Sequence, residues 1–149
     1  MPADLTVIKD MLESVAFSQK CGVKIDVFEP GKVVCSMAAQ DWFFTPMGTV
    51  AAGPIFTLAE MAGAVLLSAS LDLTKYSLVA KRLEIQFKRP GQGALKTELA
   101  MTADEVKKIE ADNLAAGGKS DAPVKVDIVG ENGKVVAEIL GIYQIRKLG

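Results

Sequence analysis

Glu60 is the residue of this sequence whose surroundings point most clearly to chemistry. It is the only charged residue between Asp41 and Asp72, and the segment from Gly53 to Leu67 around it is apolar on nearly every side. Such a segment is typical of a helix that is buried all round. A carboxylate in its middle loses much of its hydration unless it is paired, protonated or next to a wet cavity. Glu60 is therefore a candidate functional acid, and the alternative is that it only pairs with a Lys or bonds to a neighbouring backbone.

The absence of histidine limits the chemistry further. It excludes Ser-His and Cys-His nucleophile pairs and histidine metal ligands. Acid–base chemistry near neutral pH must then come from a carboxylate with a raised pKa, a tuned Lys or Cys, or water. The two cysteines, Cys21 and Cys35, lie in candidate strands without metal-ligand spacing. We therefore expect no metal and no cofactor.

Composition and charge indicate one globular domain over residues 1–149. Half of the residues are hydrophobic and 23% are charged, and the net charge of −1 lacks the basic excess of a nucleic-acid-binding domain. Free thiols and no recognisable secretion signal favour the cytoplasm. The apolar run 51–71 has the length of a membrane span. Glu60 at its centre, Pro54 near its start and acidic flanks argue against a span.

Hydrophobic periodicity predicts the elements that would position Glu60. Strands are expected over 21–28, 32–37, 77–89, 94–101, 122–129 and 134–143. Helices are expected over 4–15, 54–70 and 102–116. The last begins with a capping box of Thr102 and Glu105, and should turn Val106, Ile109 and Leu114 inward. Because only the helix over 54–70 is apolar all round, the economical arrangement is a curved antiparallel sheet wrapped around it.

The segment that leads to Glu60 resembles the acyl-CoA thioesterases of the phenylacetate-pathway type, which have the hotdog fold. That family carries Asn-Gly, a few residues, and then His-Gly-Gly-x-x-Phe-x-Leu-Ala-Asp. Gly53, Phe56, Leu58 and Ala59 coincide with this motif, and Glu60 stands where the family places its catalytic acid. The resemblance covers about residues 15–145, and it is closest to an uncharacterised thioesterase-like branch.

The sequence departs from the family motif at three positions. Ala51 replaces the His, Ala52 replaces the first Gly, and Thr45 replaces the upstream Asn. The acid itself is retained. The resemblance thus implies an α+β hotdog fold, thioester hydrolysis without a cofactor, and active sites at the interface of a homodimer or of a dimer of dimers.

A mechanism can be assigned to two candidate catalytic residues, Gly53 and Glu60. A helix N-terminus offers free N–H groups, and with Gly53 at the cap and Pro54 in the first turn the donors would be Gly53 and Ile55. These would polarise a thioester carbonyl, while Glu60 acts as general base or as nucleophile. Seven residues at 1.5 Å each separate Gly53 from Glu60 by about 10 Å. The site should therefore combine Gly53 of one subunit with Glu60 of another, unless Gly53 and Pro54 merely start the helix.

Further residues are candidates for substrate binding. They are Thr45, Gly48, Thr49, Ile55, Thr57, Lys81, Arg82, Lys88 and Arg89. The basic members cluster after the buried helix and would receive the phosphates of CoA, although a solvated sheet face would look the same. Thr57 would line the pocket or simply bond to its own helix backbone. Trp42, Phe43, Phe44 and Met47 would line an acyl tunnel or belong to the core.

Three functions remain open at this point. The first is an acyl-CoA thioesterase-like hydrolase, and the second is a protein that binds acyl-CoA or a fatty acyl chain without cleaving it. The third is a structural or interaction module on a hotdog scaffold, because fold alone does not settle function. A hotdog hydratase or dehydratase is disfavoured because its usual histidine is absent.

Overall fold

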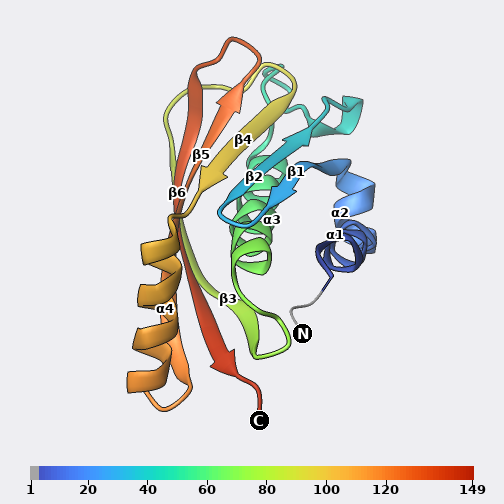
Figure 1. The fold of residues 1–149 in the computed structure, drawn as a ribbon. Helices are drawn as coiled ribbons and strands as arrows, with labels where there is room; N and C mark the ends of the chain where they lie inside the picture. Colours follow the sequence, from blue (N-terminus) through green and yellow to red (C-terminus); the bar gives the residue numbers. More distant parts are fainter. Residues whose placement is uncertain (1–3) are drawn as a thin grey trace.

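A curved antiparallel sheet of six strands wraps around one long helix (Figure 1). The structure, a computed structural model, describes residues 4–149. Its helices are α1 (Leu5–Glu13), α2 (Ala16–Cys21), α3 (Ala52–Ser70) and α4 (Ala103–Ala115), and a short 3-10 turn, η1, spans Asp41–Phe43. Its strands are β1 (Val23–Glu29), β2 (Lys32–Met37), β3 (Tyr76–Phe87), β4 (Leu95–Ala100), β5 (Lys119–Gly130) and β6 (Val135–Lys147).

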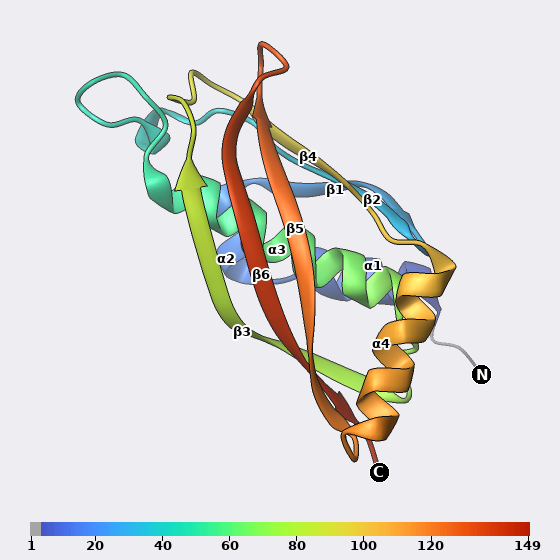
Figure 2. The ribbon, with the colours of Figure 1, turned by 90° about the vertical axis from the view of Figure 1, so that its left-hand side faces the viewer.

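The strand order is β1-β2-β4-β5-β6-β3, and each neighbouring pair is antiparallel. This confirms the expected curved antiparallel sheet. The strands β1 and β3 are its two edges, and β3 lies against β6 over almost its whole length. The strands β4 and β5 share only two residue pairs, Leu95 with Gly130 and Lys96 with Val129, before they diverge around α4. Figure 2 shows α3 crossing one face of the sheet and α4 at its lower end.

Helix α3 is the core of the molecule, as its apolar sequence predicts. By length and composition it could cross a membrane, but 67% of its most apolar stretch is buried inside the structure. The sheet covers one side of it, and α1 and α2 lie beside another side (Figure 1). It is therefore the core helix of the fold.

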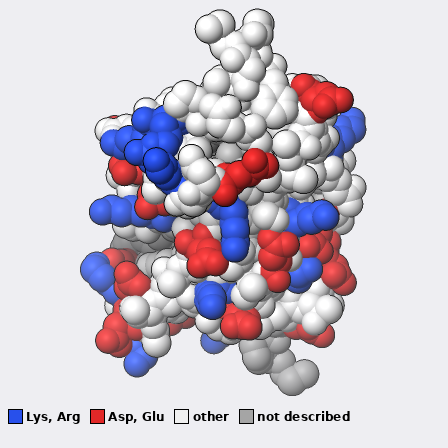
Figure 3. All heavy atoms as spheres, turned by 90° about the horizontal axis from the view of Figure 1, so that it is seen from above, with Lys and Arg blue, Asp and Glu red and all other residues white. Residues whose placement is uncertain are grey.

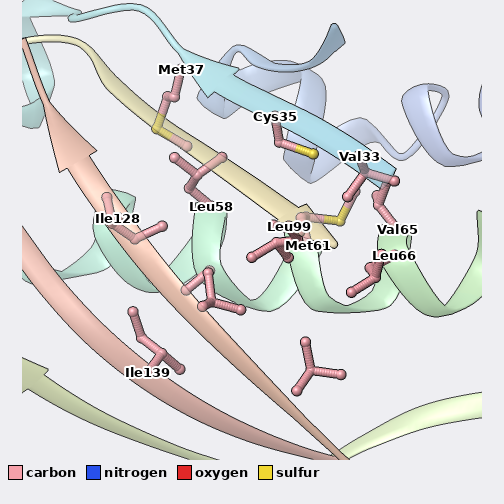
Figure 4. Packing of buried hydrophobic residues seen from close by; sticks show 14 of the residues in the cluster. Val33, Cys35, Met37, Leu58, Met61, Val65, Leu66, Leu99, Ile128 and Ile139 are labelled. Atoms are coloured by element: carbon pink, nitrogen blue, oxygen red, sulfur yellow. The ribbon is translucent and has the colours of Figure 1, made fainter. Parts of the chain in front are cut away.

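Large side chains from the sheet pack directly on α3. Figure 4 shows Val33, Cys35 and Met37 of β2 beside Leu58 and Met61 of the helix. Ile128 of β5 and Ile139 of β6 approach from the other strands, and both are almost fully buried. Burying one such side chain stabilises a fold by about 1.5–3 kcal/mol. This packing fixes which residues of α3 face the sheet and which residues face the surface.

Several details differ from the sequence-based expectations. The N-terminal helix ends at Glu13, and a second short helix, α2, follows, so Cys21 ends a helix instead of starting a strand. Gly22 allows this because it takes the left-handed conformation, with φ of 74°. In α4, Val106 and Ile109 pack against the core as expected, but Leu114 is 73% exposed. Asn113 is buried in its place.

Candidate functional site

Glu60 lies half-buried in a groove of about 510 Å³ between α1, α3 and β3. No side chain among residues 4–149 forms an ion pair or hydrogen bond with its carboxylate. The structure thus contains no Lys partner for it in a single chain. Burial removes water from the charged form and so raises the pKa of Glu60 above its ordinary value of 4.5. An unpaired carboxyl group with a raised pKa in an open groove has the properties of a general base.

Tyr143 of β6 supports the helix directly behind Glu60. Its hydroxyl donates a hydrogen bond of 2.8 Å to the backbone carbonyl of Glu60. Gly63 makes this contact possible, because a Cβ at that position would overlap the Tyr143 hydroxyl. Burial, and after it the nearby charge of Glu60, raises the pKa of Tyr143. The tyrosine therefore stays neutral and acts as a fixed support for the turn that carries Glu60.

The N-terminus of α3 is open and unpaired, but it starts earlier than expected. Ala51 is the N-cap and has no capping side chain, so Ala52 is the first helical residue and Gly53 the second. The N–H groups of Ala52 and Gly53 find no acceptor within the part of the chain that the structure describes. A Cβ added at Gly53 would meet no other atom within 4 Å. Sequence reasoning missed Ala52, because an alanine N-cap leaves no signal.

A second groove, of about 430 Å³, runs beside the start of α3 and the end of β3. It brings together four of the predicted substrate-binding residues, which are Thr49, Ile55, Lys88 and Arg89. The guanidinium of Arg89 is held by a hydrogen bond of 2.7 Å to the carbonyl of Val135. Seen from above, the surface carries a group of Lys and Arg side chains beside a wide projecting area without charge (Figure 3).

The other two predicted basic residues lie outside this groove. Lys81 forms an ion pair of 2.7 Å with Asp121, and Arg82 forms one of 3.0 Å with Glu84. Both side chains are more than half exposed. These two side chains are therefore solvated and paired with carboxylates on the sheet surface.

The predicted threonines make local hydrogen bonds. The hydroxyls of Thr45 and Thr49 lie 3.1 Å apart and close a tight turn in which Gly48 has a φ of 75°. The Thr57 hydroxyl donates to the carbonyl of Gly53 at 2.9 Å, one turn earlier in the same helix. This is the local bond that a helical threonine often makes. Thr57 and Gly53 also line a third groove, of about 510 Å³, with Phe17, Trp42 and Lys20 at its sides.

Within one chain, Glu60 and Gly53 thus line different grooves. Among the aromatic residues before α3, Phe43 is buried, while Trp42 is exposed and packs edge-on against it. Met47, in the loop between η1 and α3, is 86% exposed. That loop projects beyond the body in Figure 2. A single chain therefore presents the parts of a site without bringing the carboxylate to the helix N-terminus.

A curved antiparallel sheet wrapped around one buried helix is the hotdog fold, which thioesterase-like proteins share. Residues 7–141 match the family described as a domain of unknown function, DUF4442, and the chain belongs to that family. No curated protein matches the sequence.

Solved structures share the fold. The protein PA5026 from Pseudomonas aeruginosa, described as of unknown function and a probable thioesterase, is 30% identical, with 99% of each chain covered and a TM-score of 0.88. The thioesterase HI1161 from Haemophilus influenzae is 15% identical, with 99% of this chain and 94% of that chain covered and a TM-score of 0.72. The PaaI protein from the phenylacetic acid degradation operon of E. coli is 20% identical, with 94% and 89% covered and a TM-score of 0.67. The last two likenesses show the fold alone.

Proposed function

We propose that this protein is an acyl-CoA thioesterase-like hydrolase in which Glu60 activates water or attacks the thioester. The observation that carries the proposal is the unpaired, half-buried carboxyl group of Glu60 at a groove, with a pKa raised by burial. The 30% identity to a protein described as a probable thioesterase supports the same reaction class. The buried free thiols of Cys21 and Cys35 suit a reducing compartment such as the cytoplasm.

The site we propose is shared between two copies of the chain. Strand β3 is a sheet edge of 12 residues, and within residues 4–149 no strand pairs with its outer side. If two copies pair through this edge about a two-fold axis, the start of one β3 lies beside the end of the other. The Glu60 groove contains residues 76–80 at the start of β3, and the groove at the α3 N-terminus contains Phe87 at its end. The pairing would therefore bring Glu60 toward the N-terminus of the partner's α3, whose first turn contains Gly53, in a homodimer or in a dimer of dimers.

The chemistry then follows from the groups at hand. The N–H groups of Ala52 and Gly53 would stabilise negative charge on the thioester oxygen, aided by the helix dipole. In the general-base route, water attacks the carbonyl carbon and its proton passes to Glu60. The C–S bond then breaks, and the departing thiolate of CoA takes that proton from Glu60. The products are a carboxylic acid and free CoA, and no cofactor is required.

The CoA phosphates would bind at the basic end of the second groove. Lys88 and Arg89 line it together with Thr49. Arg89 already has one bond to Val135 that fixes its position, and its remaining N–H groups are suited to a phosphate. Lys88 would have to leave its ion pair of 3.4 Å with Glu138 to reach a phosphate. Lys81 and Arg82 would contribute less, because each is paired with a carboxylate and lies outside this groove.

The direct test is Glu60→Gln, assayed for release of free thiol from a panel of acyl-CoAs. Gln keeps the shape of the side chain but neither accepts the proton nor attacks, so we expect a loss of at least about 100-fold in kcat, the usual contribution of a general base. Glu98→Gln, on the exposed face of β4, is the matched control and should leave kcat unchanged. Unchanged turnover in Glu60→Gln would remove Glu60 from the mechanism.

A second function, binding of acyl-CoA without cleavage, is favoured by one specific observation. Ala51, at the N-cap of α3, stands where the resembling thioesterases have their histidine. Thermal stabilisation by acyl-CoA in the absence of thiol release would support this second function. Absence of any shift with acyl-CoAs would favour a structural or interaction role.

A further inference from the structure

The groove at Glu60 continues along α3 toward the carboxyl end of that helix. Glu60, Ala64 and Ser68 line it at intervals of four residues, so they lie in one row on the helix surface. At 1.5 Å per residue, this floor extends about 12 Å from Glu60 to Ser68. The groove therefore has a direction, with the candidate reacting carboxyl group at one end.

Two walls and an end close the groove. Met11 and Leu12 of α1 form one wall, and residues 78–80 of β3 form the other. Leu73 and Leu148 lie beyond Ser68, at the end away from Glu60. The N–H of Leu148 donates a hydrogen bond of 2.7 Å to the carbonyl of Lys75, which holds the end of the chain across the turn before β3. The length of a ligand in this groove would be limited there.

The lining suits an uncharged aliphatic chain. Among the lining residues that the structure describes, only Glu60 carries a charge at neutral pH, and only Ser68, Tyr76 and Ser77 have hydroxyls. The other lining side chains are apolar, and the volume of about 510 Å³ lies in the range of small-molecule sites. A charged acyl tail would lose its hydration here without a partner, whereas a hydrocarbon chain would gain from leaving water.

We infer that this groove holds the acyl chain of a medium-length aliphatic thioester, with its carbonyl at Glu60 and its methyl end beside Ser68, next to Leu73 and Leu148. With C–C bonds of about 1.5 Å, an extended chain advances about 1.3 Å per carbon, so about 12 Å accommodates roughly nine carbons. The preferred acyl groups are thus those of about eight to ten carbons. The inference rests on the proposed thioesterase function and adds the substrate class of the same site.

The first measurement is thiol release from straight-chain acyl-CoAs of increasing length, from acetyl to palmitoyl, with phenylacetyl-CoA for comparison. We expect kcat/KM to rise by about fourfold per added methylene, up to about decanoyl, which is the gain expected for a buried CH₂. Beyond that length it should stop rising. A flat profile, or a preference for phenylacetyl-CoA over decanoyl-CoA, would overturn the inference.

Two variants test the position of the chain. Ala64→Leu places a larger side chain about 6 Å from Glu60, so decanoyl-CoA should lose more than about tenfold in kcat/KM while butyryl-CoA keeps its value. Ala111→Leu, on the exposed surface of α4, is the matched control and should leave the profile unchanged. Leu73→Ala opens the far end and should lengthen the preferred chain by about two carbons. An active Ala64→Leu with the wild-type profile would contradict the assignment.

A binding measurement separates this inference from the proposed reaction. Thioether analogues of decanoyl-CoA and acetyl-CoA cannot be hydrolysed, and calorimetry gives their affinities directly. The wild type should bind the decanoyl analogue at least about 100-fold more tightly, and Ala64→Leu should lose most of that difference. If no acyl-CoA is hydrolysed but this result is obtained, the hydrolase function fails and the acyl groove stands. Equal binding of both analogues would contradict the assignment of this groove to the acyl chain, whatever the turnover.

Discussion

At the scale of single residues, Glu60 combines two costs that a structural residue would avoid. Its carboxyl group has lost part of its hydration, and no cation among residues 4–149 compensates for the loss. The neighbouring Tyr143 bonds to the backbone of Glu60 and leaves the carboxylate free. A side chain of this kind destabilises the fold while remaining available for chemistry, which is common at active sites.

The stability of the fold should therefore depend on pH through Glu60. The pKa of Glu60 is higher in the folded protein than its ordinary value of 4.5. At a pH between the ordinary pKa and the folded-state pKa, the folded protein therefore binds more protons than the unfolded chain. Stability then falls as the pH rises through this window and stays lower above it. Since Gln does not titrate, Glu60→Gln should be more stable than the wild type at about pH 8, on the order of 1 kcal/mol, and similar to it at about pH 4.

Thermal unfolding of both proteins across this pH range is the measurement. The exposed Glu84→Gln serves as the control and should show no such pH-dependent gain. A Glu60→Gln variant that is less stable than the wild type at about pH 8 would indicate that the carboxylate has a stabilising partner in solution.

At the scale of elements, α3 depends on two glycines for opposite reasons. Gly63 lets the ring of Tyr143 approach the helix, and Gly53 lies in open space at its start. Gly63→Ala should lower the free energy of unfolding by about 1–3 kcal/mol through overpacking. Gly53→Ala should leave it unchanged or raise it slightly, because alanine favours a helix. Its added methyl should nevertheless reduce turnover, since the proposed substrate carbonyl approaches this backbone closely.

Urea denaturation of the two variants, with thiol release measured on each, tests this pair. The stabilities and activities should separate, with Gly63→Ala less stable and Gly53→Ala less active. A Gly53→Ala variant with wild-type turnover would show that the substrate does not approach Gly53. A Gly63→Ala variant of wild-type stability would show that Tyr143 can move aside at little cost.

Much of this architecture could be predicted from local signals. The capping box of Thr102 and Glu105 is formed, with bonds of 2.7 and 3.1 Å. Gly133 has a φ of 76°, as expected for the Asn-Gly turn between the last two strands. Such features depend on neighbours in the sequence, so a sequence contains them directly. The apolar pattern of α3 likewise predicts a helix surrounded by other elements.

Other features depend on contacts that no local pattern contains. Asn113 is fully buried, and its amide donates hydrogen bonds to Ser120 and to the carbonyl of Ile145. These two bonds set the rotation of α4, which leaves Leu114 exposed. The six residues of α2 are too few to show a helical period. At the site, Glu60 and the basic pair Lys88 and Arg89 could be singled out by type. That they line separate grooves depends on the packing of β3 against α3.

At the scale of the whole molecule, apolar side chains remain exposed around one edge. Met47, Phe56, Val79 and Phe87 are all exposed, and they lie on the projecting loop, on α3 and on the edge strand β3. Exposed apolar side chains beside an edge strand are typical of an interaction surface. The antiparallel pairing proposed for the active site would cover it with the same surface of a second copy.

The position of Phe56 gives this arrangement a sharp test. Halfway between Gly53 and Glu60 along α3, Phe56 is 44% exposed. If the two helices run antiparallel and bring Glu60 to the partner's Gly53, their two Phe56 side chains approach each other at the two-fold axis. Phe56→Asp would place two carboxylates there, and like charges in an interface cost on the order of several kcal/mol.

For Phe56→Asp we expect light scattering to show a change from two chains to one, together with a loss of thiol release. Leu114→Asp, on the exposed face of α4, should remain a dimer and keep its activity. If Phe56→Asp stays dimeric and active, the copies meet elsewhere, and Glu60 must reach its substrate without a partner's helix.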